Sequence, residues 1–126
     1  MPNTQVLLVL AVQEAGLRSA LAAQLALSGA SLVTTSDVDD PSVLRGVRRP
    51  AVLVLDAGMA ADCPAGWLDG ALEDVRWLQI VLLSAAAVED KGGAHPKLLR
   101  AESRQAARAL SDNIPRWRQE CAQALA

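Results

Sequence analysis

Several residue types that build specialised sites are scarce in this chain of 126 residues. It has no Phe, no Tyr, one His and two Cys. The two cysteines, Cys63 and Cys121, lie far apart and show no C-x-x-C spacing, so His95 alone cannot complete a zinc-binding set with them. We therefore expect reduced thiols in a cytoplasmic protein and no structural metal.

Long apolar runs and a strong charge of one sign are also missing. The apolar run from Val6 to Val12 is too short for a signal peptide or a membrane span, and no basic stretch precedes it. The formal net charge is −2, which argues against a general binder of nucleic acids or of anionic membranes. We expect neither direct nucleic-acid binding nor membrane association.

The composition that remains is that of one globular domain. Hydrophobic residues make up 52% of the chain and charged residues 21%, which is typical of a folded protein. A chain of 126 residues can bury a core without disulfides. Three Trp and many Leu, Val and Ala residues must fill this core, because Phe and Tyr are missing. We expect a single domain spanning residues 1–126.

Apolar runs predict the strands. Three β-rich runs, at 5–12, 51–57 and 79–85, do not alternate with polar residues. Strands that are apolar on both faces are typical of a parallel sheet covered by helices on either side. Weaker candidates lie at 31–36 and 96–101. Five strands are therefore predicted.

Helical spacing of apolar residues predicts helices between these strands. The segments are 15–29, 40–49 and 65–78, and in the third of them Leu72 and Val75 fall on the same face. Strand and helix alternate, which is the pattern of an α/β fold with right-handed crossovers. The predicted architecture is a doubly wound, five-stranded parallel sheet with helices on both faces.

Two polar residues stand where the third and fourth strands end. In open α/β sheets, sites form beyond the carboxyl ends of the strands, and Asp56 and Ser84 lie there. Asp56 has two interpretations: a nucleophile, or a cap that binds backbone N–H groups of residues 57–62. Ser84 is either a functional hydroxyl or a small polar residue that closes a strand. Both pairs of interpretations stay open at this point.

The strand "VLVLD" ending in Asp56, the strand "IVLLS" ending in Ser84 and the helix after "VLLVLAV" carry a family resemblance. In this order they resemble the receiver domain of two-component response regulators, over roughly residues 4–110. The resemblance implies a flavodoxin-like fold. In that family an Asp at the end of the third strand receives a phosphoryl group from a histidine kinase. The resemblance places Asp56 at this phosphoacceptor position and Ser84 at the hydroxyl position.

The rest of the receiver site departs from the family pattern. The two acids that help to hold Mg²⁺ should follow the first strand, where the chain has Val12 and Gln13, with Glu14 as the only carboxylate nearby. The lysine of the fifth strand aligns best with Arg100. Mg²⁺ neutralises charge during phosphoryl transfer, and losing ~4 kcal/mol of such stabilisation slows a reaction about a thousandfold. We therefore expect that Asp56 is not phosphorylated in the ordinary Mg²⁺-dependent way.

Two further departures concern helices. Residues 85–95 are too few and too rich in Gly for the fourth helix of a receiver, which we expect to be reduced or missing. The receiver-like core should end near residue 110, so that residues 111–126 add a C-terminal helix, kinked or started anew at Pro115. An apolar stripe at helical spacing runs along this segment, formed by Leu110, Ile114, Trp117, Cys121 and Leu125. The stripe either folds back over the domain or forms an interaction face.

These observations predict a pseudo-receiver: a signalling domain without enzymatic activity that acts by protein–protein contact and has no cofactor. Its partners would be a histidine kinase, another receiver or an output domain, and a homodimer fits the resemblance. One alternative is a phosphorylatable receiver that uses Asp56, with Gln13 and Glu14 helping to hold Mg²⁺. Another is a flavodoxin-like module that binds a small molecule, although no glycine-rich phosphate loop follows the first strand.

Overall fold

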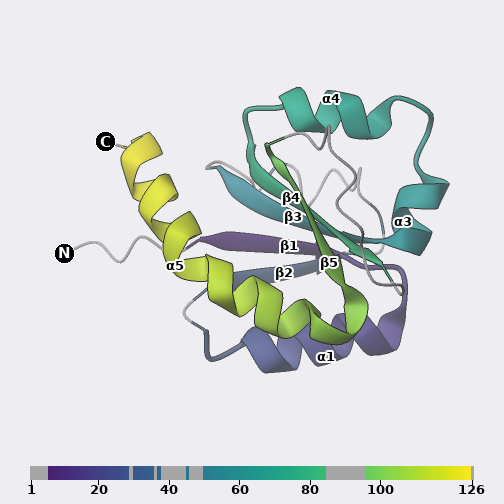
Figure 1. Ribbon diagram of the computed structural model, residues 1–126, viewed down its shortest axis with the longest axis horizontal. Coiled ribbons are helices and arrows are strands. Elements are labelled where there is room, and N and C mark those ends of the chain that lie inside the picture. The colour runs from purple at the N-terminus through teal and green to yellow at the C-terminus, as the bar shows by residue number, and fades with distance from the viewer. Residues whose placement is uncertain are drawn as a thin grey trace.

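The computed structural model of the chain describes residues 6–28, 30–35, 37, 45, 50–84 and 96–125. Five strands form one sheet in the order β2-β1-β3-β4-β5, and every neighbouring pair is parallel (Figure 1). Their bounds are Leu7–Ala11 for β1, Ser31–Thr35 for β2, Ala51–Asp56 for β3, Trp77–Ser84 for β4 and Leu98–Glu102 for β5. This order is that of the flavodoxin-like doubly wound fold, which confirms the predicted fold class.

Helices lie on both faces of the sheet. Their bounds are Ala15–Leu25 for α1, Ala57–Asp62 for α3, Trp67–Glu73 for α4 and Ala106–Leu125 for α5, with a short 3-10 helix, η1, at Ser103–Gln105. The helices α1 and α5 cover one face, and α3 and α4 cover the other (Figure 1). All six residues of β3 are buried, which explains why its sequence does not alternate between apolar and polar residues.

The helix predicted over residues 65–78 is shorter in the structure. It ends at Glu73, Val75 lies in a turn with 89% of its surface exposed, and Trp77 already begins β4. The carboxylate of Asp74 explains this early end, because it accepts a hydrogen bond from the backbone N–H of Arg76 at 3.0 Å. Such a local turn competes with continuation of the helix. The placement of Val75 on a buried helix face was therefore wrong.

The C-terminal helix is one continuous element. Residues 106–125 form a single helix that runs through Pro115, so the additional helix expected over 111–126 is a continuation of the helix that begins at Ala106. Four residues of its apolar stripe, at most 2% exposed, lie in the core that α5 shares with α1 and the sheet: Leu110, Ile114, Trp117 and Cys121. The exposed Pro115 lies on the other side of the helix. In this structure the stripe folds back over the domain and is not open to a partner; the side chain of Leu125 lies outside the described part.

A buried glutamine fixes the middle of α5 to the sheet. The side-chain oxygen of Gln79, on β4, accepts hydrogen bonds from the indole N–H of Trp117 at 3.0 Å and from the guanidinium of Arg116 at 2.9 Å. Its amide nitrogen donates to the backbone oxygen of Lys97 at 3.1 Å. Because each of these polar atoms is bonded, burial of the amide is compatible with a stable core.

Some predicted elements lie outside the described residues. They are the reduced helix at 85–95 with His95, and the helix at 40–49 except for Arg45, which is helical. Among the helices that the structure describes, none combines the length and the apolar character needed to cross a membrane.

Candidate functional site

Asp56 ends β3 and caps α3. The residue is 7% exposed, and both of its carboxylate oxygens accept hydrogen bonds from the backbone: Oδ1 from the N–H of Met59 at 2.9 Å, and Oδ2 from the N–H of Glu14 at 3.0 Å. An acid that caps a helix stabilises its first turn. The capping role left open by the sequence is therefore present, and the same carboxylate also holds the loop between β1 and α1.

The side chain of Glu14 is turned toward its own helix. It is the N-cap of α1, and its two carboxylate oxygens accept hydrogen bonds from the backbone N–H groups of Gly16, at 2.9 Å, and Leu17. Its own N–H is the one that reaches Asp56. The two acids are therefore joined through the backbone of Glu14, and the Glu14 carboxylate is engaged elsewhere.

The two acid-pair positions carry no acid and are occupied in other ways. Val12 is fully buried, and its backbone oxygen accepts a hydrogen bond from Arg18 at 2.8 Å. The side-chain amide of Gln13 donates to the carboxylate of Asp62 at the end of α3. Its oxygen lies over Gly58, where an added Cβ would come within 2.3 Å of it. Gln13 thus bridges the β1–α1 loop and α3.

The end of β5 carries a negative charge where the alignment predicted a positive one. Ser84 is half-buried at the end of β4, and its partner across the β4–β5 pair is Glu102. Arg100 is exposed and lies beside Leu82, two residues earlier. The alignment of Arg100 with the lysine position stays a prediction, and the residue that the sheet places beside Ser84 is Glu102. Glu102 is half-buried and is paired with Arg104 at 3.7 Å.

Sequence reasoning missed Glu102 because it began the fifth strand too early. Pro96 and Lys97 form a turn, and pairing with β4 starts at Leu98. Pro cannot donate a hydrogen bond to a sheet but is tolerated as the first residue of an edge strand, so Pro96 did not rule out a strand that starts there. The observed strand starts two residues later and ends one residue later than the predicted range 96–101, so the prediction left Glu102 out.

The residues at this edge of the sheet do not fit a receiver-type magnesium site. Mg²⁺ is commonly held by one or two carboxylates together with phosphate oxygens and waters. Here Glu14 caps α1, and Gln13 is bonded to Asp62. No cluster of three or more His, Cys, Asp or Glu side chains suited to a metal occurs among the described residues. To hold the metal as the alternative expects, Gln13 and Glu14 would have to exchange these protein partners for it.

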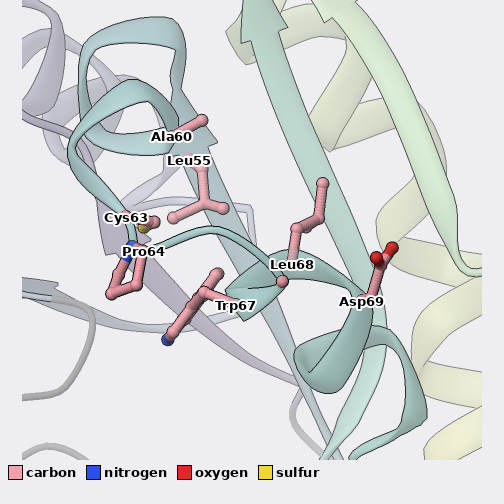
Figure 2. Close-up of a pocket in the computed structure, with 8 residues that line it drawn as sticks. Leu55, Ala60, Cys63, Pro64, Trp67, Leu68 and Asp69 are labelled. Atoms are coloured by element: carbon pink, nitrogen blue, oxygen red, sulfur yellow. The ribbon is translucent and has the colours of Figure 1, made fainter.

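A pocket of about 110 Å³ lies beside this edge, between α3 and α4 (Figure 2). It is present because the connection from β3 to β4 is split into two short helices by Pro64 and by Gly66, whose φ of 83° suits glycine. The lining side chains are Leu55, Ala60, Cys63, Pro64, Trp67, Leu68 and Asp69. Pro64 and Gly66 are visible in the sequence, but a helix over residues 57–62 was not predicted, since that segment lacks an apolar period of sufficient length.

A comparison with solved structures finds a receiver. The chain is similar to the crystal structure of a response regulator receiver domain protein from Bacillus halodurans, with a TM-score of 0.64 over 87% of this chain and 97% of that chain. The chain has the receiver fold. Sequence identity is 13%, so the likeness concerns the fold, and the role of the site must be argued from its residues. No protein-family model matches this receiver-fold chain, and no curated protein sequence matches it.

Proposed function

We propose that this receiver-fold domain is a cytoplasmic pseudo-receiver: a signalling module without enzymatic activity that acts by protein–protein contact and not through Mg²⁺-dependent phosphorylation of Asp56. The observation that carries the proposal is the binding of both oxygens of Asp56 by backbone N–H groups, from Met59 and from Glu14. A carboxylate used in this way stabilises the protein. These two hydrogen bonds occupy two of the roughly four lone-pair sites of the carboxylate and lower its nucleophilicity.

The charges around Asp56 support the same proposal. Phosphoryl transfer to a carboxylate brings anions together, so the site must supply positive charge. The family's acid positions have Val12 and Gln13, and the residue opposite Ser84 is Glu102. A carboxylate at the last of these positions repels a phosphoryl oxygen where an ammonium would attract it.

The partners that we propose are those of the receiver family: a histidine kinase, another receiver, an output domain or a second copy of this chain. Because the apolar stripe of α5 is buried, contact would use the exposed side of that helix, where Ser111, Pro115 and Gln119 lie. Light scattering over a concentration series tests the homodimer. A mass that stays at that of one chain removes a second copy from the list of partners.

The test of the site is a titration with Mg²⁺ and beryllofluoride, which mimics a phosphoryl group on aspartate, followed by amide NMR. We expect no saturable shifts at the amides of Glu14, Met59 or Ser84. Asp56→Asn and Asp112→Asn are compared; Asp112 is an exposed acid on α5. Saturable shifts that persist in Asp112→Asn and disappear in Asp56→Asn would establish the phosphorylatable alternative and contradict the proposal.

A further inference from the structure

The pocket between α3 and α4 has the size of a site for one small apolar group. Its volume is about 110 Å³, whereas pockets for drug-sized ligands measure about 300–1,000 Å³. An engineered apolar cavity of about 150 Å³ binds benzene. The pocket therefore has room for at most one small ring or branched aliphatic group, and a nucleotide or a flavin does not fit.

The lining limits the chemistry of such a ligand. Leu55 of β3 lies on one side of the space, Trp67 and Leu68 of α4 on another, and Cys63 and Pro64 come from the connecting loop (Figure 2). Most of the side chains that line it are apolar and none is a cation, while the surface of the pocket as a whole is about equally polar and apolar. The exposed carboxylate of Asp69 also belongs to the lining and disfavours an anion. The matching class is a small apolar molecule that is neutral or carries an amine.

The pocket is linked to Asp56 by two hydrogen bonds at one residue. The backbone N–H of Met59 donates to Asp56, and the backbone oxygen of Met59 accepts a hydrogen bond from the thiol of Cys63 at 3.2 Å. These bonds span the whole of α3, which has six residues. So short a helix has little stability of its own, so displacement of Cys63 by a ligand is passed on to the cap at Asp56.

We propose that this pocket binds a small apolar molecule of about one ring and that its occupancy is transmitted through α3 to the Asp56 carboxylate. The coupling rests on the proposed function, because a receiver fold that is not controlled by phosphate needs another input. The binding does not rest on it. Ligand entry loosens or tightens the hydrogen bonds by which Asp56 holds α3 and the β1–α1 loop.

The test is a titration of the whole chain with benzene, followed by amide NMR. We expect saturable shifts at the amides of Cys63 and Trp67. Ala60→Leu fills the pocket from α3 and should weaken binding at least about tenfold, while Ala61→Leu, the same change at an exposed neighbour, should leave affinity unchanged. If Ala60→Leu does not fold, Leu68→Trp adds bulk from the facing helix.

Each outcome decides one part of the proposal. The binding site is overturned if no saturable shift occurs up to the solubility of benzene. It is also overturned if wild type and Ala60→Leu bind benzene with equal affinity. The amide of Glu14 does not line the pocket and should shift with the same midpoint as Cys63. A Glu14 amide that stays unchanged at saturating benzene overturns the coupling. The benzene titration contains no beryllofluoride. A negative result with benzene therefore leaves the test of the proposed function at Asp56 unaffected.

Discussion

The two faces of the sheet are covered in different ways. One carries α1 and α5, helices of 11 and 20 residues, and encloses a fully buried Trp117. The other carries α3 and α4, of six and seven residues, and leaves Trp67 half-buried beside a pocket. Long helices with continuous apolar stripes hold one face closed. Short helices bury less and open more readily, so conformational response is expected on the second face.

Asp56 is where the two faces meet. One of its oxygens binds the N–H of Glu14, the residue that caps α1, and the other binds the N–H of Met59 in α3. A single buried carboxylate thus joins the closed face to the face with the pocket. Its two hydrogen bonds therefore contribute to the cohesion of the fold.

The largest effect is expected on the closed face. Trp117→Ala removes a fully buried indole that packs in the core, so we expect a loss of about 4 kcal/mol in the free energy of unfolding, measured in urea. Gln119→Ala, an exposed neighbour on the same helix, should change stability by less than about 0.5 kcal/mol. Similar losses of stability in the two variants would contradict the tight packing of α5 against its face of the sheet.

A smaller effect is expected in the polar network of α5, in which Gln79 accepts hydrogen bonds from Arg116 and Trp117. Gln79→Leu leaves the indole N–H of the buried Trp117 without its acceptor, which should cost about 2 kcal/mol in unfolding experiments. The control is Gln24→Leu, an exposed position on α1. If Gln79→Leu proves as stable as the control, the network does not hold the helix.

On the pocket face, Trp67→Ala should cost less than the same change at Trp117. The side chain of Trp67 is half-buried, so the loss of apolar burial is expected to be about 1 kcal/mol. Urea unfolding of the two tryptophan variants side by side measures the difference. A loss at Trp67 equal to that at Trp117 would mean that the two faces are equally closed.

The smallest effect concerns two glycines in short helices. Gly58→Ala pushes the side chain of Gln13 aside, whereas Gly70→Ala meets open space. Alanine stabilises a helix relative to glycine by about 0.5–1 kcal/mol, so Gly70→Ala should gain this amount and Gly58→Ala should not. The side-chain amide resonance of Gln13 should shift only in Gly58→Ala. An equal gain in both variants would show that Gln13 does not hold α3.

The fold could be predicted from the sequence because strands that are buried on both faces appear as uninterrupted apolar runs. The runs at 5–12, 51–57 and 79–85 became three neighbouring strands, and Asp56 ends the central one. The interrupted connection between β3 and β4 was not predicted, since short helices lack a full apolar period. The stripe on α5 indicated a buried face, but no periodicity can say whether a sheet or a partner buries it.

The site was less predictable than the fold. Asp56 could be located from the strand pattern, and its capping role was one of two interpretations. The pairing of Ser84 with Glu102 was not predicted, because it depends on the register between β4 and β5, which the sequence does not specify. Neither the bond between Glu14 and Asp56 nor that between Gln13 and Asp62 has a sequence signal, because both depend on how separate elements meet in space.

The free energy of unfolding of Asp56→Ala tests the central claim most directly. If Asp56 joins the two faces, the variant loses both hydrogen bonds and should be less stable than wild type by about 2 kcal/mol. Asp112→Ala, at an exposed acid, should change stability by less than about 0.5 kcal/mol. An Asp56→Ala protein as stable as wild type, or more stable, would contradict the account.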